Sequence, residues 1–176
     1  MILLHYGNNK NKYIRYGIYA ILIVVVAILQ NTVGFPPAVF GARAFILLPV
    51  CVSIAMYERE IAAAVFGVIA GVLWDVSSAS DGFNAVVLLI LCAVCSLLIS
   101  HFMRNNVLTS LVLCSGSVVA YSLIYVFVNI TASGAGVGIK QFLTFYLPSC
   151  IYTLVLTPVF YFIVSWIFNS HKTADE

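Results

Sequence analysis

Long apolar runs separated by short polar breaks extend along almost the whole chain. A helix rises about 1.5 Å per residue, so about 20 such residues cross the roughly 30 Å hydrocarbon core of a bilayer. The strict alternation of barrel strands is missing from these runs. The pattern predicts an all-α integral membrane protein, a bundle of about six transmembrane helices. The six predicted spans are Tyr16 to Val33, Pro37 to Tyr57, Ile61 to Ser80, Phe83 to Ser100, Val107 to Ile130 and Phe142 to Phe168.

Composition supports a single transmembrane domain over residues 1–176. Hydrophobic residues make up 63% of the chain and charged residues 8%, whereas soluble domains carry about 25% charged residues. The polar tails and breaks are too short to bury a core of their own. A net charge of +2 with dispersed basic residues excludes a nucleic-acid surface, so the lipid bilayer is the expected environment.

The distribution of lysine and arginine predicts the orientation. With six crossings, six of the eight basic residues fall on one side and two on the other. Cytoplasmic loops carry an excess of Lys and Arg, so both termini are expected in the cytoplasm. The cytoplasmic set is Lys10, Lys12, Arg15, Arg59, Arg104 and Lys172, and the opposite set is Arg43 and Lys140.

One acidic residue, Asp75, interrupts the third apolar run. The 14 residues between Glu60 and Asp75 would rise only about 21 Å as a helix, less than the thickness of the hydrocarbon core. Asp75 is therefore expected in the outer part of the membrane, facing protein or water instead of lipid. It is predicted to be either a buried hydrogen-bonding anchor that closes the outer end of the bundle or a ligand or proton site.

Small residues share one helix face with this aspartate. Ala63, Gly67, Gly71 and Asp75 are spaced four apart and form a nearly straight stripe. Small residues at this spacing let another backbone approach closely. The stripe predicts a helix-docking face, and its partner is either a neighbouring helix of the same chain or another protein.

The polar turn after this run adds two candidate structural residues. Gly82 permits a tight turn, and Asp81 can cap the helix that follows. Asn84 is placed to reach back toward the Asp75 end of the hairpin.

The residues needed for catalysis do not form a recognisable set. Cys92 and Cys95 make a C-x-x-C pair inside an apolar helix with no second ligand pair, which favours packing over metal or redox chemistry. The five cysteines all lie in apolar runs, unlike a secreted disulfide framework. His5, His101 and His171 fall near helix ends or in tails. We therefore expect no enzyme, no metal and no cofactor.

Between the second and third predicted spans lies a short acidic turn, Glu58-Arg59-Glu60. Together, this turn, the small-x-x-x-Gly-x-x-x-Asp stripe and the downstream Gly-x-Asn-Ala resemble the rod shape-determining protein MreD family. The residues that carry the resemblance are Gly67, Gly71, Asp75, Gly82, Asn84 and Ala85, with Pro49 and Glu58 in weaker agreement.

This resemblance implies a non-enzymatic, multi-pass component of the bacterial cytoplasmic (inner) membrane. Its role would be in the wall-elongation machinery that gives rod cell shape. The implied partners are a single-span MreC-like membrane protein and a wall-synthesis complex containing MreB and synthases of the RodA and penicillin-binding kind.

A protein of another class has a similar layout. The substrate-binding membrane subunit of an energy-coupling-factor vitamin importer is also a small bundle of about six helices. Such subunits typically carry Ala-x-x-x-Ala in the first helix, whereas here Ala20 is followed four residues later by Val24. Apart from Asp75, Gln141 and scattered hydroxyl residues, intramembrane polar groups that would bind a vitamin are sparse.

Overall fold

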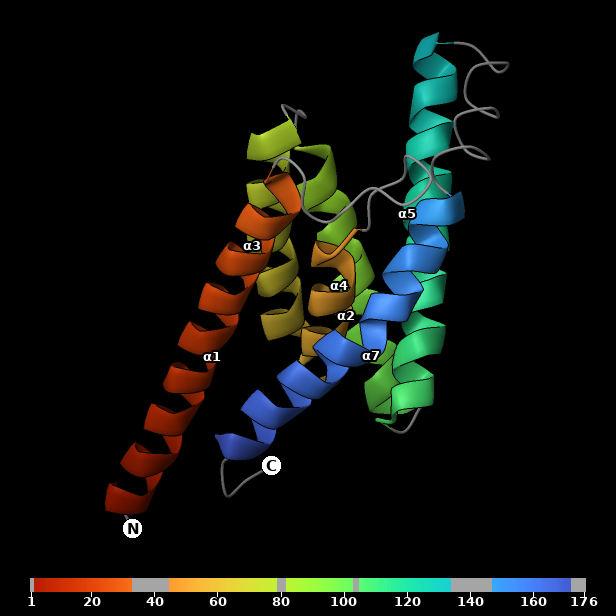
Figure 1. Cartoon of the computed structure of the whole chain (residues 1–176). Coiled ribbons are helices and arrows are strands. Elements are labelled where there is room, and N and C mark those ends of the chain that lie inside the picture. Colours follow the sequence, from red (N-terminus) through yellow and green to blue (C-terminus); the bar gives the residue numbers. More distant parts are fainter. Residues whose placement is uncertain (1, 33–44, 79–81, 103–104, 134–146, 172–176) are drawn as a thin grey trace.

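A computed structural model describes residues 2–32, 45–78, 82–102, 105–133 and 147–171, and all regular structure in these ranges is helical (Figure 1). The helices are α1 (Ile2–Asn31), α2 (Leu47–Tyr57), α3 (Glu60–Ser78), α4 (Phe83–His101), α5 (Val107–Ser133) and α7 (Leu147–Ser170).

Five of these helices are long and apolar enough to cross a membrane. The predicted all-α membrane bundle is therefore confirmed for those five. The second predicted span is described only from Phe45 onward, and its helix is Leu47–Tyr57, 11 residues. Such a helix rises about 16 Å, about half of the hydrocarbon thickness. The first part of that span, from Pro37, lies outside the described residues, so a sixth crossing stays a prediction.

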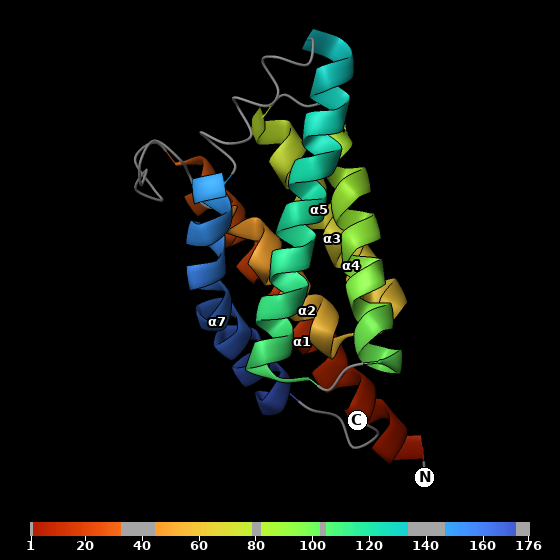
Figure 2. The ribbon, with the colours of Figure 1, turned by 90° about the vertical axis from the view of Figure 1, so that its right-hand side faces the viewer.

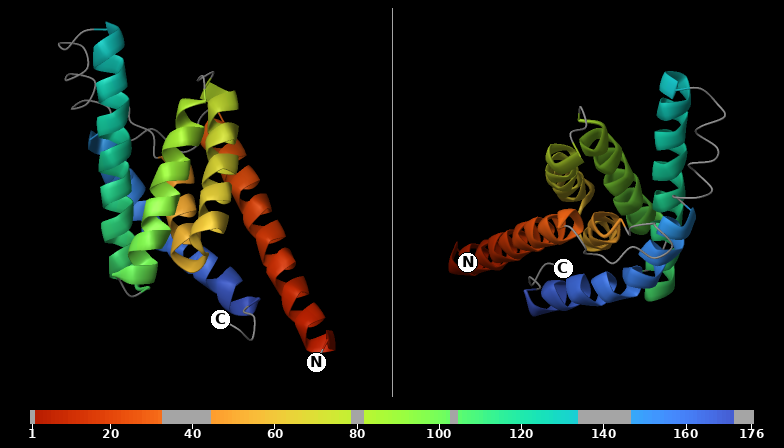
Figure 3. Two further views of the ribbon diagram at one scale, coloured as in Figure 1. Left: turned by 180° about the vertical axis from the view of Figure 1, so that it is seen from behind. Right: turned by 45° about the horizontal axis from the view of Figure 1, so that its top comes forward.

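The short helix α2 forms the centre of the bundle. Every residue from Leu47 to Met56 is buried, as expected for a helix that is apolar on all sides. It contacts α1, α3, α4, α5 and α7, and Figure 3 shows it enclosed by the longer helices. The longer helices instead expose apolar side chains to the outside, as the lipid-facing surface of a membrane protein must. Examples are Ile21, Val76, Phe127 and Val155.

The bundle has two ends with different contents. At one, here called the termini end, lie the first turns of α1, the last turn of α7 and the junction of α2 with α3 (Figures 1 and 2). At the other, here called the hairpin end, α3 finishes and α4 begins. α3 and α4 pack as an antiparallel hairpin, and α5 pairs with α7. The buried polar residues discussed below gather at these two ends.

Candidate functional site

Asp75 lies at the hairpin end with its carboxylate buried against the start of α4. The side chain is 6% exposed. Its Oδ1 accepts a hydrogen bond from the backbone N–H of Asn84 at 3.1 Å, and its Oδ2 accepts one from the N–H of Ala85 at 2.9 Å. The first N–H groups of a helix have no partner within the helix, and they form the positive end of its dipole. Asp75 thus caps α4 from the neighbouring helix.

The residue immediately before α4 is a glycine, which has no side chain with which to cap the helix. Gly82 has a φ of +81°, a left-handed conformation that suits glycine. Asp81, the local cap expected from the sequence, lies outside the described residues. Asn84 reaches Asp75 through its backbone N–H and not through its side chain.

The glycine stripe packs against α4 of the same chain. A Cβ built on Gly71 would meet backbone atoms of Ala85 and, at 2.7 Å, the carbonyl oxygen of Asn84. A Cβ on Gly67 would lie 2.7 Å from the carbonyl oxygen of Leu88. Such separations are too short for any residue with a side chain. The two glycines bring α3 and α4 close enough for the Asp75 carboxylate to reach the α4 amides.

Ala63 and Cys92 complete the surroundings of the stripe. Ala63 is 1% exposed, so the stripe is buried from its first residue. The side chain of Cys92 would lie 3.1 Å from a Cβ on Gly67. Cys92 is a free, buried thiol that fills space beside the glycine. Of the two kinds of partner expected for this face, the structure places α4 of the same chain on it.

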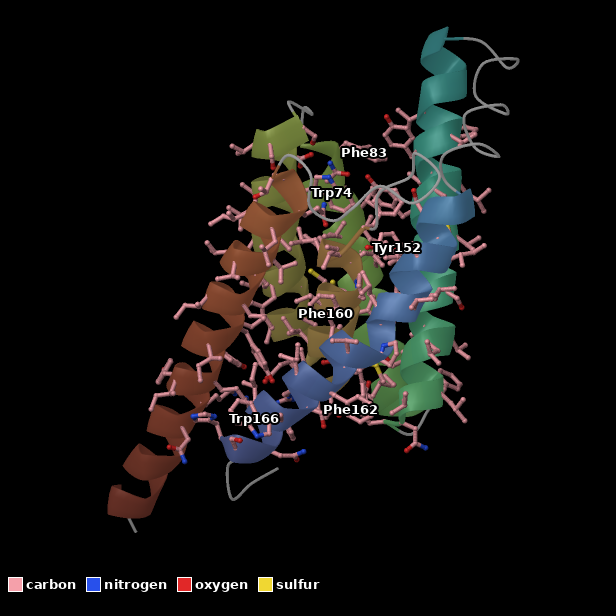
Figure 4. The ribbon with its side chains drawn as sticks, viewed as in Figure 1. Trp74, Phe83, Tyr152, Phe160, Phe162 and Trp166 are labelled. Atoms are coloured by element: carbon pink, nitrogen blue, oxygen red, sulfur yellow. The ribbon has the colours of Figure 1, made fainter. Side chains whose placement is uncertain are left out.

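An aromatic cluster joins this hairpin to α5. The hydroxyl of Tyr121 donates to Oδ1 of Asn84 at 2.7 Å, and the Tyr121 ring stacks on Trp74 with centroids 5.3 Å apart and planes at 17°. Phe83 meets Tyr121 edge to face at 6.3 Å. Figure 4 shows Trp74 and Phe83 near one another at the hairpin end. We call Asp75, Asn84 and Tyr121, with the α4 amides, the hairpin clamp.

A second polar cluster, at the termini end, was not expected from the sequence. Arg15 is fully buried, and its Nε lies 2.7 Å from Oε1 of Glu58, which is itself 6% exposed. The Arg15 guanidinium also lies 4.7 Å from the ring centroid of Phe168. The hydroxyl of Ser96 donates to the carbonyl oxygen of Glu58 at 2.8 Å. This termini clamp therefore joins α1, the end of α2, α4 and α7.

A sequence signal for the buried arginine does exist. Arg15, Tyr19 and Ile23 are spaced four apart, and all three are fully buried. Continuing the apolar face of α1 backwards by one turn places Arg15 on the inside. The positive-inside rule uses only the charge of Arg15 and not its spacing, so it does not predict that Arg15 is buried.

The acidic residues of the two clamps bind protein donors. Within the described ranges, no three His, Cys, Asp or Glu side chains come together in a way that would hold a metal ion. The Asp75 and Glu58 carboxylates are both engaged by protein donors.

These features define a polytopic α-helical membrane protein whose buried polar groups tie helices together. The family model described as "rod shape-determining protein MreD" matches residues 11–171, nearly the whole chain, and the chain belongs to that family. Comparisons with curated proteins and with solved structures gave no match. Family membership fits a role in determining rod cell shape.

Proposed function

We propose that the chain is a non-enzymatic scaffold of the bacterial wall-elongation machinery in the cytoplasmic membrane, with both termini in the cytoplasm. The family match over residues 11–171 is the observation that carries the proposal. In this role the protein docks a single-span, MreC-like partner and so contributes to the complex that includes MreB and synthases of the RodA and penicillin-binding kind.

The site residues support this role by building a rigid platform. Gly67, Gly71 and Asp75 fix the α3–α4 hairpin, and Asn84 ties it to Tyr121 of α5. A scaffold needs a surface of constant shape, and interlocking helix contacts provide one. We assign Ala63 and Gly82 the same structural purpose, at the two ends of this segment.

The partner's transmembrane helix is proposed to dock in a groove between α4 and α5. The groove has a volume of about 470 Å³ and opens on the outside of the bundle. Its walls are apolar apart from the glycine backbone, so it suits an apolar helix and offers no hydrogen bonds to a polar ligand. The residues lining it are Gly82, Phe83, Val86, Val87, Ile90, Leu91 and Ile124.

Site-specific photo-cross-linking tests this docking surface. A photoreactive phenylalanine at Ile90, in the groove, should capture the partner in native membranes. The matched control is the same residue at Ile28 of α1, which is exposed and apolar but lies away from the groove. Capture at Ile28 and not at Ile90 would contradict the groove assignment.

Depletion in a rod-shaped host tests the role itself. Cells should become round or swollen while solute import continues, because a scaffold positions other proteins and transports nothing. Loss of uptake of one vitamin with cell shape preserved would instead support the importer-subunit alternative.

The proposed orientation is tested by a separate experiment. Cysteines placed near both termini should resist membrane-impermeant labelling in intact cells.

A further inference from the structure

A second groove, at the termini end between α1 and the start of α3, combines charge with apolar walls. It has a volume of about 470 Å³. The residues lining it are Lys12, Tyr16, Arg59, Glu60, Ile61, Ala62, Val65 and Phe66. It shares no lining residue with either clamp or with the α4–α5 groove, but Tyr16 and Arg59 directly follow Arg15 and Glu58 of the termini clamp in the chain.

The polar and apolar residues of this groove are segregated along its length. Lys12 precedes Tyr16 by one helical turn of α1. Arg59, immediately before α3, precedes Ala62 and Val65 by about one and two helical turns. A turn rises about 5.4 Å, so Lys12 and Arg59 lie nearer the termini end than Tyr16, Ala62 and Val65. The same order, from headgroup to acyl chain, is found in a membrane leaflet.

The apolar part is a preformed wall. Tyr16 and Phe66 meet edge to face with ring centroids 5.5 Å apart, which fixes the back of the groove. Ile61 and Val65 are 82% and 52% exposed beside it. Apolar side chains this exposed, near the membrane surface, are available to an acyl chain.

The charged part has a cationic excess. The lining contains two cationic residues, Lys12 and Arg59, and one carboxylate, that of Glu60, so it carries one net positive charge. The Glu60 carboxylate is engaged by the hydroxyl of Ser100 on α4, at 3.1 Å. Arg59 is exposed, and the Lys12 ammonium lies 5.7 Å from the ring centroid of Tyr16. Both cations stand where a headgroup phosphate would reach them.

We propose that this groove, the α1–α3 lipid groove, binds an anionic phospholipid. Lys12 and Arg59 bind the phosphate of the headgroup, and Tyr16, Val65 and Phe66 contact the first part of an acyl chain. Basic residues between transmembrane helices near the membrane surface are the usual means of holding such headgroups. The inference does not depend on the proposed scaffold role or on the α4–α5 groove.

Native mass spectrometry of the detergent-solubilised full chain tests the proposal. The probes are phosphatidylglycerol and phosphatidylcholine with identical acyl chains. The wild type should retain phosphatidylglycerol preferentially, and the Lys12→Gln/Arg59→Gln variant should lose about tenfold or more of that affinity. Glycerol phosphate, which has the charge but no acyl chain, should not displace the lipid at equal concentration.

Matched variants separate the groove from net charge. Lys12→Arg/Arg59→Lys keeps both cations and should retain the preference. Asn106→Asp/Asn169→Asp lowers the net charge by the same amount at exposed positions of the termini end and should also retain it. Ala62→Phe, which fills the groove without changing charge, should reduce lipid retention.

Three results would contradict the lipid groove. Equal retention of the two lipids by the wild type would overturn the proposal, as would an equal loss in the Asn106/Asn169 control. Displacement by glycerol phosphate would show a free-phosphate site and contradict the lipid assignment. Thermal unfolding of each variant in the same detergent shows that the differences come from binding and not from misfolding.

Discussion

Each of the two clamps holds a buried carboxylate, but the groups that bind the carboxylate differ. At the hairpin end, the Asp75 carboxylate accepts hydrogen bonds from two backbone N–H groups at the start of α4. At the termini end, the Glu58 carboxylate is paired with the Arg15 guanidinium, whose Nε lies 2.7 Å away. Both carboxylate residues are 6% exposed, but only the second clamp requires two buried charges.

This difference determines how each clamp responds to change. A carboxylate bound by backbone amides leaves behind only uncapped N–H groups when it is removed. A carboxylate bound by a guanidinium leaves behind a buried cation. Removing one member of a buried ion pair costs about 3 to 5 kcal/mol, whereas replacing both members by apolar residues is often neutral or stabilising. The termini clamp should therefore be more sensitive to single substitutions and more tolerant of a paired one.

The largest expected effect is at Glu58. Glu58→Leu leaves the Arg15 guanidinium buried without its counter-ion and should lower the free energy of unfolding in detergent by about 3 to 5 kcal/mol. The double variant Arg15→Met/Glu58→Leu should recover most of that loss. If the double variant is as unstable as Glu58→Leu alone, the ion pair is not the source of the effect.

The sequence pattern locates one clamp and misses the other for a physical reason. The regular spacing of Gly67, Gly71 and Asp75 identifies a close-packing face, because small residues four apart on a membrane helix let a second backbone approach. It does not identify the partner: only the structure shows α4 on that face, and the backbone of Asn84 as the donor. From the sequence, Arg15 is assigned only to topology, because a basic residue before the first span ordinarily indicates it. Its four-residue spacing with Tyr19 and Ile23 is the signal that places it on the buried face.

The fold is more predictable than the site. Five long apolar helices are recognisable from length and composition. The central position of α2 is not, because a helix that is apolar on all sides fits either lipid or a protein interior. The burial of its residues from Leu47 to Met56 distinguishes the two.

The next effect in size concerns Gly71. Gly71→Ala adds a Cβ that meets the backbone of Ala85 and Asn84, which cannot move aside as a flexible side chain would. The hairpin should open enough to weaken the Asp75 cap, with a loss of about 3 kcal/mol in the free energy of unfolding. Gly116→Ala is the control, because a Cβ there meets nothing within 4 Å. Equal behaviour of the two variants in thermal unfolding would contradict close packing of α3 on α4.

Substitution of Asp75 should have a somewhat smaller effect. Asp75→Leu removes both acceptors from the Asn84 and Ala85 amides and should cost about 2 to 3 kcal/mol. Asp75→Asn keeps one acceptor but turns an NH₂ group toward the other amide, so about half of that loss is expected. The graded order, wild type above Asn above Leu, can be measured both as stability and as partner co-purification. A proton or cation site would instead lose function fully with Asn while stability changed little.

The smallest predicted effect tests how far the hairpin clamp extends into α5. Tyr121→Phe removes the hydroxyl that donates to Asn84 Oδ1 but keeps the ring stacked on Trp74, so a loss of about 1 kcal/mol is expected. Asn84→Ala removes the acceptor and leaves the backbone N–H that binds Asp75. If the hydroxyl acts through Asn84, the double variant should be no less stable than Asn84→Ala, giving a coupling energy of about 1 kcal/mol in the double-mutant cycle. Strictly additive losses would show that α5 is held by the aromatic stack alone and that the hairpin clamp ends at Asn84.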